Sequence, residues 1–232
     1  MFRSGRKLFS QNFLHDRELV KKLIRNSSIG KNDLVVEIGP GKGIITEELL
    51  KKGVKVIAIE IDHDWYNYLQ INFGTSNNFL LTNQDALNFI FPKTSFKVFA
   101  NIPFSLEGRL VRKLLLDDYL KDCYLVVRKE VAYRWAGMFG NNMFQISYLP
   151  WFDFYLFYHF KKTDFLPMTK VKAVMLRIKC KDHFLLPQSQ KQNYRDFVKE
   201  CFENWRLNFS LSRLTLKQWL NLYERKNISS NQ

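Results

Sequence analysis

The chain has little of what marks a secreted, metal-binding or membrane protein. Its three cysteines, Cys123, Cys180 and Cys201, are an odd number without metal-ligand spacing, so we interpret them as reduced packing residues of a cytoplasmic protein and expect no metal. The most apolar run, residues 151–160, has ten residues and is too short to span a bilayer. The basic N-terminal residues are not followed by an apolar run, so no signal peptide is expected. Repeats and low-complexity segments are also missing, which argues against a solenoid or a disordered chain.

Acidic residues are few relative to basic ones. The chain has 36 Lys and Arg against 22 Asp and Glu, a net charge of +14 that is spread along the sequence. Such an excess favours a polyanionic partner, and an enzyme of small molecules has no need of it. A hydrophobic content of 46% with 21 Phe predicts a substantial core, and 232 residues suffice for one large domain and a small appendage.

Strand, turn and helix alternate through the first half of the chain. Short apolar runs typical of buried strands lie at 34–38, 55–59, 79–82, 97–100 and 123–127, and patterns typical of helices lie at 16–25, 44–52, 62–73 and 106–115. This alternation predicts an α/β fold with a parallel sheet. Ligands of such sheets bind beyond the carboxyl ends of the strands.

A glycine-rich turn follows the first of these strands. Three of the ten glycines, Gly39, Gly41 and Gly43, lie within five residues, where they let the main chain approach a ligand closely. The spacing is G-x-G-x-G and not the G-x-G-x-x-G of dinucleotide folds. The acidic side chain of Glu37 beside the turn also argues against a pyrophosphate.

Acidic residues follow the next two strands. Glu60 lies 21 residues beyond Gly39, where a carboxylate can accept both hydroxyls of a ribose, and Asp85 follows the third strand. Each acid alone is more simply read as a solvated turn residue. Together, in this order after a glycine turn, they indicate an adenosine without phosphates, for which S-adenosylmethionine is the obvious candidate.

The segment 101–104, Asn-Ile-Pro-Phe, closes the fourth strand and is interpreted as the reaction site. An amide, a rigid proline and an aromatic ring at a strand end can hold a flat base and bond its exocyclic amine. Taken alone, the segment is more simply interpreted as a strand that ends in a proline turn.

The second half of the chain has a different character. Residues 146–160 are rich in aromatics and predict an extended segment with both faces covered. Residues 161–181 contain seven basic residues and one acid, the densest basic segment of the chain. A charge run is usually a solvated face, so a role in binding nucleic acid depends on its lying beside the Asn101 segment.

The C-terminal residues are predicted to form their own domain. Helical patterns at 194–205 and 215–223 indicate a small helical domain of residues 182–232, after a catalytic domain of residues 1–181.

Five segments carry a resemblance to a known family. They are QNFL at 11–14, EIGPGKG at 37–43, AIEID at 58–62, QDA at 84–86 and NIPFS at 101–105. In order and spacing, over nearly the whole chain, they resemble the rRNA adenine N6-methyltransferases. The resemblance implies a Rossmann-like class I methyltransferase sheet with a small helical C-terminal domain, S-adenosyl-L-methionine as cofactor, and a cytoplasmic monomer that acts on ribosomal RNA.

Within that family the chain looks more like the Erm branch. Ile102 stands where the housekeeping enzymes usually have Leu, and the short, basic C-terminal region that ends with residues 214–220 resembles the Erm tail. This branch methylates an adenine of 23S rRNA and confers macrolide, lincosamide and streptogramin B resistance. The alternatives are a housekeeping small-subunit rRNA dimethyltransferase, acting on RNA or a pre-ribosomal particle, and a non-catalytic nucleic-acid-binding relative.

The family's roles transfer to individual positions of this chain. The resemblance implies catalytic roles for Asn101, Ile102, Pro103 and Phe104, and cofactor contacts at Asn12, Leu14, Gly39, Gly41, Glu60, Ile61, Asp85, Ala86 and Asn101. It implies that Phe104 stacks on the target adenine, that Phe165 faces the base from its other side, and that Arg134, Lys161 and Lys162 bind RNA. Two departures concern the target side. Thr169 and Ala173 replace the usual proline and serine of the late motif, and Phe104 replaces the commoner Tyr.

Overall fold

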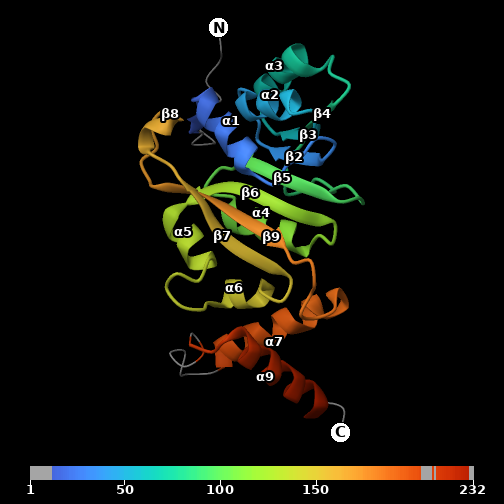
Figure 1. The fold of residues 1–232 in the computed structure, drawn as a ribbon, viewed down its shortest axis with the longest axis vertical. Helices are drawn as coiled ribbons and strands as arrows, with labels where there is room; N and C mark the ends of the chain where they lie inside the picture. The colour runs from blue at the N-terminus through green and yellow to red at the C-terminus, as the bar shows by residue number, and fades with distance from the viewer. Residues whose placement is uncertain (1–11, 205–210, 212, 230–232) are drawn as a thin grey trace. The chain divides into compact units, whose positions relative to one another are not determined.

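The computed structural model describes residues 12–204, 211 and 213–229 of the chain (Figure 1). Its main feature is a seven-stranded sheet of order β4-β3-β2-β5-β6-β9-β7. The strands are β2 (Leu34–Ile38), β3 (Lys55–Glu60), β4 (Phe79–Asn83), β5 (Phe96–Asn101), β6 (Leu120–Arg128), β7 (Phe152–His159) and β9 (Ala173–Cys180). The pairs β2 with β3, β2 with β5, β3 with β4 and β5 with β6 are parallel, which confirms the predicted α/β class.

A second, two-stranded sheet pairs β1 (Phe13–Leu14) in antiparallel fashion with β8 (Phe165–Leu166). The helices are α1 (Arg17–Asn26), α2 (Ile44–Lys51), α3 (His63–Phe73), α4 (Glu107–Leu116), α5 (Lys129–Trp135), α6 (Met143–Tyr148), α7 (Lys191–Asn204) and α9 (Leu216–Ser229), with short 3₁₀ turns η1 (Lys162–Asp164) and η2 (Gln188–Gln190).

Several helices begin where the sequence supplies a capping side chain. Asp16 Oδ1 accepts the main-chain N–H of Leu19 at 3.1 Å before α1, and Asp62 Oδ1 accepts that of Asp64 at 2.9 Å before α3. Such an acceptor satisfies an N–H that has no partner within the helix. Because α3 begins directly after β3, the cap on Asp62 also fixes the end of that strand.

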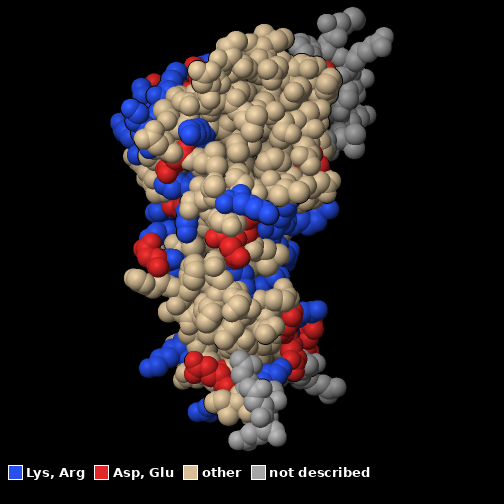
Figure 2. Space-filling model, turned by 90° about the vertical axis from the view of Figure 1, so that its right-hand side faces the viewer, with Lys and Arg blue, Asp and Glu red and all other residues tan. Residues whose placement is uncertain are grey.

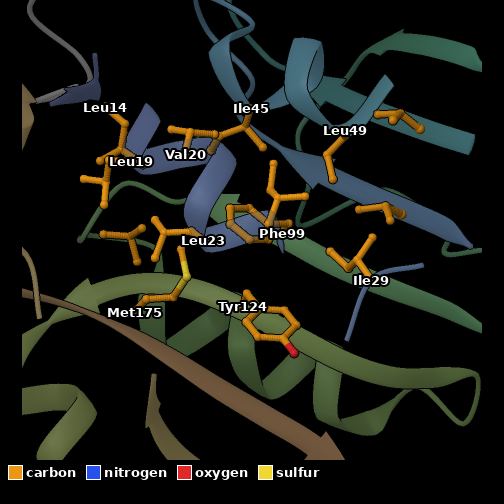
Figure 3. Packing of buried hydrophobic residues seen from close by; sticks show 14 of the residues in the cluster. Leu14, Leu19, Val20, Leu23, Ile29, Ile45, Leu49, Phe99, Tyr124 and Met175 are labelled. Carbon is orange, nitrogen blue, oxygen red and sulfur yellow. The ribbon is translucent and has the colours of Figure 1, made fainter. Parts of the chain in front are cut away.

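A hydrophobic cluster joins α1 and α2 to one face of the sheet (Figure 3). Leu19, Val20 and Leu23 of α1 point into it at helical spacing, and the stacked rings of Phe99 and Tyr124 supply the sheet side, with centroids 5.8 Å apart. In β2, β5, β6 and β9 the alternate residues, which point to the opposite face, are mostly buried too. Both faces of the sheet are therefore covered at these strands, as their continuous apolar runs require.

The chain divides into two compact units. The first contains Met1–Lys129 and Leu156–Arg177, and the second contains Glu130–Tyr155 and Ile178–Gln232. Within the second unit α6 packs against α7, which is why residues before 181 group with the C-terminal helices. This division differs from a single boundary after residue 181, and a separate domain over 182–232 stays a prediction.

One predicted element begins at the wrong place. The extended segment expected at 146–160 starts only at Phe152, since Ile146 and its neighbours belong to α6. The cause is a cap that the hydrophobic pattern conceals: Asn142 Oδ1 accepts the N–H of Gln145 at 3.0 Å and so starts a helix.

Basic side chains are dispersed over the face shown in Figure 2, with Asp and Glu side chains near some of them. This agrees with a net charge of +14 that is spread along the sequence. In the part of the chain that the structure describes, no helix combines the length and the apolar character needed to cross a membrane.

Candidate active site

The connections of the parallel sheet change direction at β2. From β2 the chain continues to β3 and β4 on one side, whereas β5 pairs with the other edge of β2. Such a switch point leaves a crevice beyond the carboxyl ends of the two strands. A pocket lies there, next to the paired residues Ile38 and Ala100. It is lined by Asn12, Phe13, Gly39, Asn101, Ile102, Pro103 and Phe104.

The three glycines of the turn after β2 serve different purposes. All have positive φ angles, +68° at Gly39, +53° at Gly41 and +74° at Gly43, a region that favours glycine. A Cβ on Gly41 would collide with the ring of Phe13, and a Cβ on Gly43 with the ring of Phe73. A Cβ on Gly39 would meet nothing within 4 Å. Gly39 is therefore the glycine at which a ligand can approach the main chain, while the other two make room for aromatic rings.

Glu60 lies at the end of β3 and holds the glycine turn in place. Its Oε2 accepts the N–H of Gly41 at 3.0 Å and its Oε1 accepts that of Asp62 at 2.9 Å. The side chain is buried, and this burial raises the pKa of the carboxyl group while the main-chain donors lower it. Each oxygen can still accept a second hydrogen bond, so the ribose contact stays a prediction. The N–H of Gly41 is thus engaged by Glu60, and the predicted contact of Gly41 with the cofactor stays a prediction.

Glu37 in β2 is a second buried carboxyl group beside the turn. It is 1% exposed; its Oε2 accepts the Thr46 hydroxyl at 2.6 Å, and its Oε1 has no partner among the described residues. Burial raises the pKa of Glu37 from 4.5 to about 8, the Thr46 hydrogen bond opposes this shift, and Glu60 adds to it. Burial therefore favours the protonated, neutral form of Glu37, which weakens the argument that its negative charge excludes a pyrophosphate. The glycine spacing supports that exclusion independently.

The remaining cofactor residues predicted from the sequence lie at the carboxyl ends of β3 and β4, outside the pocket lining. Ile61 is exposed, Asp85 is half-buried, and Ala86 is buried. The Asp85 carboxylate accepts the N–H of Leu87 at 2.8 Å. These residues share the sheet edge at which Glu60 ends, and their contact with the cofactor stays a prediction.

Asn101, the last residue of β5, has an oriented side-chain amide. Its Nδ2 donates a hydrogen bond to the main-chain carbonyl of Asn12 at 2.7 Å. No donor within residues 12–204 is bonded to its Oδ1. Asn101 thus brings an available hydrogen-bond acceptor to the pocket that both asparagines line.

The loop from Ile102 to Phe104 completes the pocket. The Pro103 carbonyl accepts the N–H of Leu106 at 2.9 Å, which closes a turn into α4. The ring of Phe104 is half-buried, packs against the hydrophobic cluster and also lines the pocket. The structure therefore brings the predicted reaction segment together with Asn12 and Gly39.

A buried carboxylate that the sequence did not reveal fixes the start of α4. Glu107 Oε1 accepts the main-chain N–H of Arg128 at 2.6 Å, and Glu107 Oε2 pairs with its guanidinium Nε at 3.0 Å. The pair connects the helix that follows the reaction loop to the carboxyl end of β6. No local pattern in the sequence links these two residues.

Pairing of β1 with β8 decides which predicted residues reach the pocket. In this register Phe13 is opposite Leu166, and Leu14 is opposite Phe165. Opposite residues share a face of the pair, and consecutive residues alternate. Leu14 and Phe165 point into the hydrophobic cluster, whereas Phe13 lines the pocket and Leu166 is 54% exposed.

This arrangement places two of the predicted site residues, whose contacts with cofactor and base stay predictions. The Leu14 side chain does not line the pocket, and the neighbouring Phe13, which the sequence reasoning passed over, does. Phe165 is 1% exposed and packs on Phe160 at 5.2 Å, so in this conformation its ring is not available to a base. Consecutive residues of a strand point to opposite faces, so Phe13 and Leu14 cannot both face the pocket. This alternation was the signal that could have identified Phe13.

The predicted RNA-binding cations lie in different parts of the chain. Lys161 and Lys162 are exposed directly before β8, which β1 connects to the pocket through Phe13. The pairing of β8 with β1 links the start of the basic segment to a strand whose Phe13 lines the pocket. Arg134 is exposed on α5 in the second unit. Contacts of all three with RNA stay predictions.

The sheet order, the glycine turn at the switch point and the pocket beyond it define a Rossmann-like methyltransferase. Among known proteins, the ribosomal RNA adenine dimethylase family matches residues 2–232, and the chain belongs to this family. It is an rRNA adenine methyltransferase that uses S-adenosylmethionine. The open space beside Gly39 and the unpaired acceptor of Asn101 fit such a cofactor.

Individual relatives agree with the family. The chain is 34% identical over 219 residues to "Ribosomal RNA small subunit methyltransferase A" of Mycoplasmopsis pulmonis, covering 91% of this chain and 82% of the relative. It is 29% identical over 216 residues to the protein of the same name from Caldanaerobacter subterraneus, covering 85% and 78%.

Solved structures share the fold. The 23S rRNA methyltransferase ErmE superposes with a TM-score of 0.80 at 23% identity, covering 92% of this chain and 99% of ErmE. A dimethyladenosine transferase from Plasmodium falciparum gives a TM-score of 0.72 at 26% identity, covering 82% and 70%.

Proposed function

We propose that the enzyme dimethylates adenine N6 in small-subunit ribosomal RNA. The observation that carries the choice of subunit is the 34% identity, over 91% of the chain, to a relative named as a small-subunit methyltransferase. The net charge of +14 supports an RNA substrate. So do Lys161 and Lys162, which are exposed just before β8.

Asn101 is proposed to prepare the adenine amine for attack. The lone pair of N6 is delocalised into the ring, which makes the amine a poor nucleophile. With its Nδ2 held by the Asn12 carbonyl, Asn101 offers Oδ1 to one N6 hydrogen, and the main-chain carbonyl of Ile102 takes the other. Two such acceptors favour a pyramidal nitrogen with a localised lone pair.

The bound S-adenosylmethionine supplies an electrophilic methyl group. Gly39, beyond the carboxyl end of β2, and Asn101, at the end of β5, would hold it so that the methyl group faces the amine. The chain needs no general base before transfer, since the product cation is acidic enough to lose its proton to water. Positioning is therefore the main contribution of these residues.

Phe104 is proposed to hold the target base outside its stack. Extracting a base costs a few kcal/mol, and stacking on an aromatic ring can return about 1–3 kcal/mol. The ring of Phe104 lines the pocket next to Pro103, and its packing against the core keeps it in place. A phenylalanine provides the stacking face without a hydroxyl group.

Methylation of 23S rRNA with antibiotic resistance, the function of the Erm branch, is the second candidate. Ile102 and the segment 214–220 favour it. The likeness to ErmE, at 23% identity, supports the fold alone. The cytoplasmic location and the monomeric state also remain proposals.

Methyl transfer to isolated ribosomal subunits tests the choice. Small and large subunits that lack the modification are incubated with protein and S-adenosylmethionine, and the RNA is digested for mass spectrometry and mapped by primer extension. We expect dimethyladenosine in small-subunit RNA only. Product confined to 23S rRNA would replace the proposal with the Erm function. An Asn101→Ala variant serves as the control for contaminating activity.

A further inference from the structure

We propose that Lys113 is a positioning residue for the adenosine end of the cofactor site, where its ammonium group holds the turn that begins at Asp85. The inference rests on the proposed function in one respect, the contact of Asp85 and Ala86 with the cofactor. Lys113 lies in α4, four residues after the exposed Arg109.

The ammonium group of Lys113 is fully engaged by main-chain oxygens. Its Nζ donates hydrogen bonds to the carbonyls of Ala86 at 3.0 Å, Leu87 at 2.8 Å and Phe89. A lysine has three N–H donors, so all three are used by one turn. Lys113 therefore acts as a fixed part of this turn and not as a mobile surface charge.

The carbonyls that accept hydrogen bonds from Lys113 belong to the turn that begins at Asp85. The Asp85 carbonyl accepts the N–H groups of Asn88 at 2.9 Å and Phe89 at 3.1 Å, and its carboxylate accepts that of Leu87. These bonds close the turn, and its carbonyls at Ala86, Leu87 and Phe89 accept their hydrogen bonds from Lys113 of α4. The positive charge of Lys113 also attracts the Asp85 carboxylate, while burial lowers the lysine pKa.

The far end of the same turn has an anchor besides Lys113. Phe91 is buried and stacks on Phe96 of β5 with ring centroids 5.4 Å apart. Lys113 Nζ lies 5.0 Å from the Phe91 ring centroid, a cation–π distance. Removal of the ammonium group should therefore leave Phe91 in place and loosen only the segment nearer Asp85.

Helix α4 thereby connects two parts of the site. It begins directly after the reaction loop that ends at Phe104, and Glu107 in its first turn is fixed to Arg128. Nine residues after Phe104, Lys113 reaches the turn at the end of β4. One helix therefore connects the loop on the target-base side to the turn on the predicted adenosine side of the cofactor site.

Cofactor binding without RNA tests this role. Isothermal titration calorimetry on the full chain would use S-adenosylhomocysteine and 5′-methylthioadenosine, which lacks the amino-acid end. For Lys113→Met we expect affinity for both ligands to fall by about tenfold, with partial recovery in Lys113→Arg. Arg109→Met, on the same face of α4 and exposed, is the matched control and should remain within about twofold of wild type.

Folded Lys113→Met with unchanged affinity for both ligands would overturn the inference, as would a loss restricted to S-adenosylhomocysteine. Should that variant not fold, hydrogen exchange on the wild type decides: methylthioadenosine must slow exchange at Leu87–Phe89, and no change there refutes the role. Because RNA is absent, wild-type protein that binds S-adenosylhomocysteine yet methylates no rRNA would refute the proposed function alone.

Discussion

The side-chain amide of Asn101 is held by the main-chain carbonyl of Asn12 at 2.7 Å. This hydrogen bond joins the segment before β1 to the carboxyl end of β5, across 89 residues of sequence. It also fixes which atom of the amide is available, because a nitrogen that donates to Asn12 leaves the oxygen as the acceptor. Asn12, which lines the pocket, thus determines which side-chain atom of Asn101 is available to a ligand.

Replacing Asn101 should impair both partners of the reaction. Asn101→Ala removes the acceptor for the adenine amine and the bond to Asn12, so we expect methyl transfer to fall by on the order of 100-fold and S-adenosylhomocysteine binding to weaken. Asn101→Asp retains the oxygens and loses the donor to Asn12, so its activity measures how much orientation matters. Full activity of Asn101→Ala on rRNA would refute the proposed amine contact.

Replacing Phe104 should weaken the binding of the target base and leave the affinity for the cofactor unchanged. Phe104→Ala removes the stacking face, worth about 1–3 kcal/mol, so kcat/KM for rRNA should fall by about 5- to 150-fold. Phe104→Tyr keeps the face and should remain active. Calorimetry with S-adenosylhomocysteine is the control, and an equal loss of cofactor affinity in Phe104→Ala would contradict the role.

The sequence predicted the fold, and with it the sheet edge that the candidate site residues share, for a physical reason. Strand periodicity determines a parallel sheet, and the carboxyl ends of its strands must share an edge, so Gly39, Glu60, Asp85 and Asn101 could be placed together before any coordinates. Separate roles of the glycines could not be predicted. They depend on which ring, Phe13 or Phe73, packs over each one.

Contacts between segments far apart in the sequence account for the other differences between the predicted site and the structure. Phe13 and Leu166 face the pocket side of β1 and β8 because two segments about 150 residues apart pair in one register, and a shift of one residue would have exposed Phe165. Likewise, the bonds from Lys113 to the turn after Asp85 follow from the placement of α4. Neither relationship leaves a periodic signal in the sequence.

The register of β1 and β8 separates the roles of Phe165 and Leu166. Phe165→Ala should lower the free energy of unfolding by about 3–5 kcal/mol, because it empties a core position. Leu166→Asp should leave stability unchanged and weaken methylation of rRNA, since it places a negative charge where RNA is expected. Ile71→Asp, at a position 82% exposed on α3, is the control. Urea denaturation and kcat/KM for rRNA provide the two measurements, and normal kinetics of Leu166→Asp would remove it from the target side.

Burial of Glu37 should make the enzyme less stable as the pH rises. Its pKa is about 8 in the folded chain and 4.5 when unfolded, so between these values the folded state holds a proton that the unfolded state releases. The stability contributed by the protonated group is fully present below pH 4.5 and is lost as the pH rises toward 8, by up to about 1.4 kcal/mol per pH unit.

Glu37→Gln keeps an oxygen for the Thr46 hydroxyl and cannot ionise. We therefore expect the variant to lose less unfolding free energy than wild type between pH 5 and pH 8, as measured by urea denaturation across that range. Exposed Glu18→Gln is the control and should follow the wild-type curve. Parallel curves for wild type and Glu37→Gln would mean that Glu37 is already ionised in the folded chain, and its negative charge beside the glycine turn would again count against a pyrophosphate ligand.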